Sequence, residues 1–429
     1  MGDAAALSGT PLVHAPEFLA SVLAATLMTA PVTAATSDHP QITALDGVRG
    51  LAIGVVLIAH MTVIGPELSW IDALLTRVAW TGWIGVDVFF VLSGFLITGI
   101  LLDSKGDPHY FRSFYARRVL RIFPLYYFIV VVSLLVLPHL HHPKAQNFGR
   151  IAGDELYYWF FLSNFSISMR EALRHGILDV SWSLAIEEQF YLVWPLVVLL
   201  TSARSLKQLA VVLAVFSLCL RSWIMLHDTH QWWYAFFWTP CRLDSLAAGA
   251  WAACVVREEG GLARLQRLSR PAIAVGALAF FLIWLREGGD LDAGFFKNTI
   301  GFSLLALLSL GLLSAALSDA RTTWLARVFE SKPLRTLGKY SYALYLLNMP
   351  LRAVIRDLVY PTSKFVTFHG ARTPGQLLFY LLAFPVVFSG AWLSWHLYEK
   401  HFLALKRFFP SRPDLRNQLQ AQRSAVSPH

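Results

Sequence analysis

Apolar stretches close to the length of a membrane span recur along the chain, separated by short polar segments. A helix needs about 20 apolar residues to cross a bilayer core, and irregular backbone cannot face lipid because its polar groups would stay unpaired. The pattern therefore predicts an all-α, polytopic membrane protein. We place ten transmembrane helices, at residues 49–64, 82–102, 123–138, 182–200, 208–226, 241–256, 272–286, 298–317, 340–358 and 376–398.

The basic residues between these helices predict their orientation. With the N-terminus inside, the cytoplasmic segments hold 23 Lys and Arg residues and the outer segments hold 11. Cytoplasmic loops are enriched in Lys and Arg, so both termini are expected in the cytoplasm. The segment ELYYWFFLSNF (155–165) is too short to cross, and a crossing there would turn every later basic loop outward. We expect a short re-entrant or interfacial element on the outer side.

The same pattern divides the chain into three regions. Residues 1–44 contain no Lys or Arg, so the apolar stretch 18–35 lacks the basic start of a signal peptide. We expect a poorly ordered extension or a misassigned start there, with a cleaved signal as the alternative. Residues 45–405 form the ten-helix domain. Residues 406–429 are rich in Arg, Pro and Gln, and a disordered cytoplasmic tail is expected.

Composition supports the membrane assignment. Hydrophobic residues make up 56% of the chain and charged residues 15%, against about 25% charged residues in soluble domains. The formal charge of +9 could suggest a nucleic-acid partner, but basic cytoplasmic loops account for it, so none is expected. Three cysteines without a pair pattern indicate neither a disulfide framework nor a zinc site, and no metal is expected.

Ionisable residues within the predicted helices are the candidates for chemistry. Arg49 and His60 are separated by about 16 Å of helical rise and lie on one face, because eleven residues make almost three full turns. His60, Asp87 and Glu187 fall at a similar depth below the outer boundary. Charges in hydrocarbon cost about 2.5–3.5 kcal/mol each, so this coincidence predicts a shared polar cavity. Glu188 points about 100° away from Glu187, and we assign only Glu187 to the cavity.

Each of these residues also has a structural interpretation. His60 could be a hydrogen-bond donor between two helices. Asp87 or Glu187 could be one half of an ion pair with Arg221 or Arg242. The sequence alone leaves these alternatives open.

The segment HYFRSFYARRVLRIFPLYYF follows the second predicted span. Arg117 and Arg121 are four residues apart and Arg118 lies on the neighbouring face, which predicts an amphipathic interfacial helix that ends before Pro124 begins the next span. Orientation signals and an aromatic belt would explain this composition. Alternatively, the guanidinium groups could bind phosphates.

Six sequence blocks together resemble the membrane acyltransferase-3 family. They are LDGVRGLAIGVVLIAH, GVDVFFVLSGFLIT, FYARRVLRIFPLYY, SWSLAIEEQFYLVWP, RLDSLAAGA and GKYSYALYLLNMP, and the resemblance runs from about residue 42 to 405. It implies ten helices in a bacterial inner membrane. It also implies transfer of an acyl group, with acetyl expected, from cytoplasmic acyl-coenzyme A as co-substrate to sugar hydroxyls of a surface polysaccharide, a lipopolysaccharide or another glycan. No permanently bound cofactor is implied, and the oligomeric state stays open.

The resemblance assigns three roles to residues of this sequence. The candidates for catalysis are His60, Asp87 and Glu187. Those for donor binding are Arg49, Arg117, Arg118 and Arg121, and those for acceptor binding are Trp182, Ser183, Arg242, Asp244 and Asn348. Asn348 stands where the family often has histidine, which suggests a different acceptor, and His401 stands where proline is usual.

The resulting hypothesis makes His60 the general base for a sugar hydroxyl, with Asp87 or Glu187 orienting the ring. An acyl-histidine intermediate is a less favoured variant. One alternative keeps the chemistry and moves it to a small glycosylated metabolite such as a macrolide. Another is a transporter in which the same residues form a proton relay.

Overall fold

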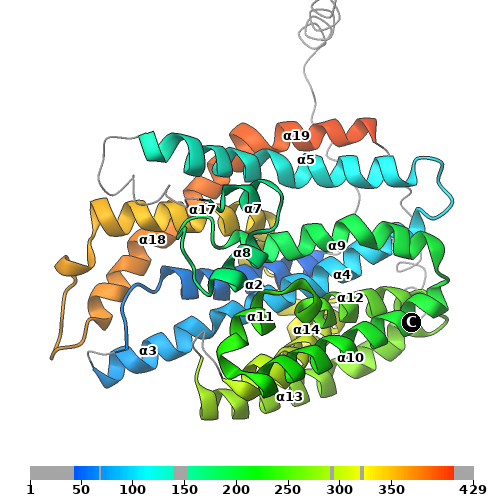
Figure 1. The fold of residues 1–429 in the computed structure, drawn as a ribbon, viewed down its shortest axis with the longest axis horizontal. Coiled ribbons are helices and arrows are strands. Elements are labelled where there is room, and N and C mark those ends of the chain that lie inside the picture. Colours follow the sequence, from blue (N-terminus) through cyan, green and yellow to red (C-terminus); the bar gives the residue numbers. More distant parts are fainter. Residues whose placement is uncertain (1–42, 67–68, 140–152, 290–293, 319–322, 410–429) are drawn as a thin grey trace, which may run out of the picture. The chain divides into compact units, whose positions relative to one another are not determined.

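The computed structural model describes residues 43–66, 69–139, 153–289, 294–318 and 323–409 (Figure 1). These residues form helices and their connections, with one isolated β-bridge between Phe368 and Ala371 and no strand among them. The all-α prediction is confirmed for this part of the chain. Most of the predicted N-terminal extension and most of the predicted tail lie outside the described residues.

The longer helices of the described residues correspond to the predicted spans. They are α2 (Thr43–Met61), α4 (Gly85–Asp103), α5 (Tyr110–Val131), α9 (Ser181–Leu200), α10 (Ala203–His227), α12 (Leu243–Val256), α13 (Gly261–Glu287), α14 (Phe302–Ala316), α17 (Ser341–Val354) and α18 (Thr373–Ser394). Shorter helices connect them: α3 (Trp70–Trp80), α7 (Glu155–Trp159), α8 (Ser163–Arg170), α11 (Trp232–Phe237), α15 (Trp324–Phe329), α16 (Lys332–Lys339) and α19 (Lys400–Ala404).

Eight helical segments of the described residues are long and apolar enough to cross a membrane. The two remaining predicted spans are helical but are not among these eight segments. They are α12, of 14 residues, and α17, of 14 residues, which continues directly into a π-helical turn, Ile355–Val359. The chain is thus a multi-pass membrane protein, while the count of ten spans and the cytoplasmic placement of both termini stay predictions.

The helix α5 corrects the predicted break at Pro124. The structure has one continuous helix from Tyr110 to Val131 with Pro124 inside it, followed by a π-helical turn, Val132–Val136. A proline inside a helix costs about 3 kcal/mol because it removes a backbone donor and crowds the preceding turn. Tyr342 and Tyr398 donate hydrogen bonds to the carbonyls of Ile122 and Pro124 and join this part of α5 to other helices. The arginines therefore lie on the same continuous helix as Pro124 rather than on a separate interfacial helix.

The aromatic segment 155–165 is short, as predicted. It folds into α7 and the beginning of α8, neither of which approaches the length of a span. At the other end, a 3₁₀ turn, Leu405–Phe408, extends the last helical segment beyond the predicted domain boundary at residue 405.

Glycines set the closest helix crossings around the core. A Cβ atom on Gly94 of α4 would lie 1.9 Å from the Leu246 carbonyl oxygen of α12. One on Gly249 of α12 would lie 2.0 Å from the Val91 carbonyl oxygen of α4. No other residue fits such crossings, and small residues are a common means of close helix packing in membranes. The two helices therefore pack backbone against backbone.

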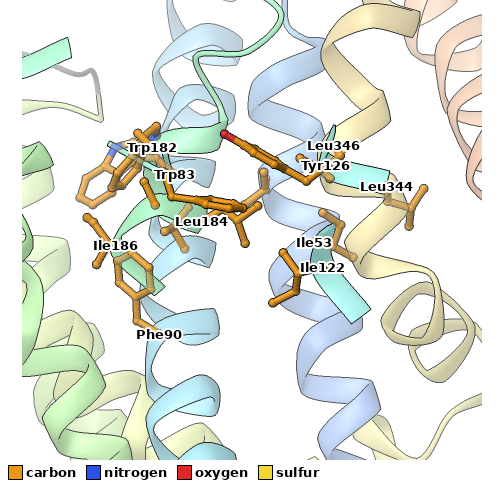
Figure 2. Close-up of a cluster of buried hydrophobic side chains, with 14 of the residues drawn as sticks. Ile53, Trp83, Phe90, Ile122, Tyr126, Trp182, Leu184, Ile186, Leu344 and Leu346 are labelled. Atoms are coloured by element: carbon orange, nitrogen blue, oxygen red, sulfur yellow. The ribbon is translucent and has the colours of Figure 1, made fainter. Parts of the chain in front are cut away.

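The hydrophobic core lies between α2, α4, α5, α9 and α17. Figure 2 shows its centre, where the labelled residues Ile53, Phe90, Ile122, Leu184 and Leu344 come from these five helices. All five side chains are buried. The same five helices form the walls of the polar cavity described next.

Candidate functional site

A cavity of about 140 Å³ lies among α2, α4, α5, α9 and α17. Its polar lining is unusual for the interior of a membrane protein. The charged and hydroxyl-bearing residues are Arg49, Ser93, Arg118, Arg121, Ser183, Glu187, Tyr191, Ser341, Tyr342 and Tyr345. Ionisable groups at membrane depth normally face such a cavity, which satisfies them without contact with lipid.

Three arginines give the cavity its charge. Arg49 comes from α2, while Arg118 and Arg121 are three residues apart on one face of α5. Arg49 is paired with Asp46 at 2.8 Å, and the Arg118 guanidinium lies 5.9 Å from the centre of the Tyr191 ring. Guanidinium groups bind phosphate oxygens with matched geometry. The arrangement can therefore hold an anion.

Arg117 does not line this cavity. It lines a neighbouring small pocket that Arg118 also borders, and its Nη1 donates to the Phe409 carbonyl at 3.0 Å. The sequence predicted that Arg117 and Arg121 would share a face. In the structure, Arg118 and Arg121 face the cavity together, and Arg117 does not.

Lys406 is a basic neighbour that the sequence analysis missed. The 3₁₀ turn that contains it follows α19, which packs against α5, and its charge interacts with those of Arg117, Arg118 and Arg121. Like charges gathered at one point repel each other, and a bound anion relieves that repulsion. No periodic signal could have found Lys406, because almost 290 positions separate it from these arginines.

Glu187 is the acidic residue of the cavity. Its two carboxylate oxygens accept hydrogen bonds from Ser93 at 2.7 Å and from Tyr191 at 3.1 Å. Glu188 does not line the cavity, and its buried Oε1 has no hydrogen-bond partner among the described residues. The structure thus places Glu187, and not Glu188, at the cavity, as the helical geometry predicted.

Asp87 lies outside the cavity, contrary to the expectation of one shared chamber. Its carboxylate accepts hydrogen bonds from Arg242 and Ser245, both at 2.8 Å, and all of Asp87 and Arg242 is buried. The Arg242 guanidinium also lies 3.8 Å from the centre of the Phe302 ring. Asp87 therefore takes the alternative that the sequence left open, as one half of an ion pair. Asp87 and Glu187 were expected at a similar depth, but their side chains point to different neighbours.

Two further candidates for acceptor binding are also buried, near the ion pair of Asp87 and Arg242. Asp244 is paired with Arg221 at 2.6 Å, and Trp182 packs against Phe236 and Phe237. Neither lines the cavity. Of the residues proposed to bind the acceptor, the cavity contains Ser183 alone.

His60 lies beyond one end of the cavity. It is the penultimate residue of α2 and is partly exposed, and its Nδ1 is 2.9 Å from Oδ1 of Asn348 on α17. The His60 ring is 6.4 Å from the ring of Tyr345, which lines the cavity. The Tyr345 hydroxyl is 2.6 Å from Ser183 Oγ. Tyr345 therefore borders the cavity and is also a neighbour of the His60 ring.

Arg352 is a second residue that the sequence analysis missed. It follows Asn348 by one helical turn, and its charge interacts with the His60 ring. Its buried Nε has no hydrogen-bond partner among the described residues. The sequence shows that Arg352 follows Asn348 by four residues and so lies on the same helix face. It does not show that this face is turned toward His60.

Comparisons with known proteins indicate the family of the chain. The sequence model of a family described as an acyltransferase domain matches residues 42–396. The chain is 28% identical over 323 residues to the peptidoglycan O-acetyltransferase OatA of Listeria monocytogenes, which covers 72% of this chain and 49% of the relative. It is 29% identical over 335 residues to the putative peptidoglycan O-acetyltransferase YrhL of Bacillus subtilis, covering 74% and 49%.

A putative O-acetyltransferase of Staphylococcus aureus is 28% identical over 339 residues, covering 73% of this chain and 51% of the relative. The chain thus spans about half the length of the curated relatives it matches. No solved structure matches the chain.

Proposed function

The chain belongs to the acyltransferase-3 family, and we propose that it is a membrane O-acyltransferase that moves an acetyl group from acyl-coenzyme A to a glycan hydroxyl. The family match over most of the chain supports the reaction class. The names of the relatives support acetyl as the group and a cell-wall glycan as the acceptor. The proposed location is the bacterial inner membrane.

The observation that carries the donor proposal is the cavity with three arginines. Coenzyme A ends in phosphate groups, and Arg49, Arg118 and Arg121 offer guanidinium groups to them. Arg49 and His60 stand on one face of α2, about 16 Å apart along the helix. The thin arm of the donor would cover that distance and bring its thioester toward His60.

The proposed chemical step uses His60 as a general base. His60 takes the proton of the acceptor hydroxyl while the hydroxyl oxygen attacks the thioester carbonyl. A C–O bond forms, the C–S bond breaks, and the departing thiolate receives the proton from the imidazolium.

The donor site is tested by Arg118→Gln and Arg121→Gln. Each change removes a charged hydrogen-bond donor, a loss of about 1.5–3 kcal/mol. We expect the KM for acetyl-coenzyme A to rise by about ten-fold or more. The measurement is release of free thiol by the purified chain in nanodiscs, at varied donor concentrations.

Arg204→Gln is the matched control, because Arg204 is exposed in the first turn of α10 and lies outside the cavity lining. It should leave the KM unchanged. An unchanged KM in both cavity variants would contradict the proposed donor site. The arginines would then be explained by membrane orientation alone.

A further inference from the structure

The side-chain amide of Asn348 has a fixed orientation. Its Nδ2 lies 3.0 Å from the Leu344 carbonyl oxygen and 2.6 Å from the Tyr345 carbonyl oxygen. Carbonyl oxygens only accept hydrogen bonds, so the amide nitrogen must face them. The amide oxygen is therefore the atom that faces His60 Nδ1, at 2.9 Å. A flipped amide would set oxygen against two carbonyl oxygens.

This orientation determines which nitrogen of His60 carries the proton. An amide oxygen only accepts a hydrogen bond, so Nδ1 has to donate it. A neutral imidazole has a single N–H group, and the lone pair is then on Nε2. We propose that Asn348 is a positioning residue that holds His60 in the Nδ1–H tautomer and directs the Nε2 lone pair at the acceptor hydroxyl, an inference that rests on the proposed role of His60.

The packing around Asn348 suits this task. Asn348 is fully buried, and both polar ends of its side chain are occupied within the protein. An acceptor would have to break those bonds to reach it, so the geometry favours positioning over the acceptor binding predicted from the sequence. No described residue forms a hydrogen bond with Nε2 of His60, which leaves that nitrogen for the substrate.

A neutral partner also distinguishes this site from a histidine relay with an acid. A carboxylate orients the ring and stabilises the imidazolium, whereas an amide oxygen orients it with much less effect on its basicity. At this site, therefore, Asn348 orients the His60 ring but does not stabilise the positive charge of the imidazolium. Asn348→Asp would set a carboxylate oxygen against the Leu344 and Tyr345 carbonyl oxygens, so it should not hold the ring as the amide does.

The first test measures kinetics of the purified full chain with acetyl-coenzyme A and solubilised peptidoglycan glycan strands. Asn348→Leu, which keeps the branched shape of the side chain but removes both polar atoms, should lower kcat by about ten-fold or more, the scale seen when the partner of a functional histidine is removed. KM for both substrates should stay unchanged. Asn348→Asp should also lower kcat, because its second carboxylate oxygen would face the Leu344 and Tyr345 carbonyl oxygens. A raised KM for the glycan with unchanged kcat and pH profile would instead make Asn348 an acceptor-binding residue.

The second test does not depend on the acceptor. Nitrogen NMR of histidine-labelled protein, with the His60 signal identified by its loss in His60→Gln, reports the tautomer directly. We expect Nδ1–H in the wild type and a mixture of tautomers in Asn348→Leu. An Nε2–H ring in the wild type would overturn the proposal. If His60→Gln were fully active, the base assignment would fail, while the tautomer measurement would still decide what Asn348 does to the ring.

Discussion

Replacing His60 by alanine is expected to abolish O-acetylation. A general base contributes about 10²–10⁴-fold to the rate of proton transfer in the reaction. His60 is the partly exposed titratable group beside the cavity, and its Nδ1 partner orients it for that role. The measurement is mass analysis of glycan O-acetyl groups in cells expressing the variant, alongside the amount of protein in the membrane fraction.

His227→Ala is the matched control for this experiment. His227 also ends a long helix and is exposed, and its Nδ1 contacts the Trp223 carbonyl at 2.8 Å. It should leave acetylation unchanged. Full acetylation in His60→Ala at normal protein levels would eliminate the base assignment.

Replacing Asp87 by alanine should prevent the protein from accumulating. The change leaves the fully buried guanidinium of Arg242 without its ion-pair partner, and breaking a buried pair in this way costs about 3–5 kcal/mol. The cost should be high here because Nε and Nη1 of Arg242 have no hydrogen-bond partner among the described residues. The measurement is the yield of monodisperse protein after extraction.

The double variant Asp87→Leu with Arg242→Met separates folding from chemistry. Well-packed apolar pairs often replace a buried ion pair without loss of stability. We expect yield to recover, together with thiol release from acetyl-coenzyme A. If Asp87→Ala accumulated normally and were inactive, Asp87 would take part in the reaction rather than in joining α4 to α12.

Regular helical geometry made part of the site predictable. A rise of 1.5 Å and a turn of 100° per residue place Arg49 and His60 on one face and separate Glu187 from Glu188. Depth in the membrane follows from the same numbers. These predictions depend only on residues within one helix.

The direction in which each helix turns its side chains within the bundle could not be predicted in this way. Asp87 and Glu187 were expected to meet, but the rotation of each helix depends on its neighbours. The glycine crossing brings α12 against α4, and Asp87 consequently meets Arg242. The contact between His60 and Asn348 joins positions 288 apart in the sequence. Neither the helical period nor the spacing of residues along the sequence predicts a contact between positions so far apart.

The continuity of α5 shows a different limit. Pro124 was interpreted as the start of a span, but α5 continues through it from Tyr110 to Val131. A proline inside a helix costs stability without always ending the helix. Tyr342 and Tyr398 contact this part of α5 from other helices, and the local sequence contains no sign of those contacts.

The close crossing of α4 and α12 at Gly94 and Gly249 has a mechanical consequence. Two backbones in direct contact cannot roll past each other, so α4 and α12 move as one rigid body. Any widening of the arginine-lined cavity when a bulky cosubstrate enters would then have to move α2, α5, α9 or α17 relative to this pair of helices.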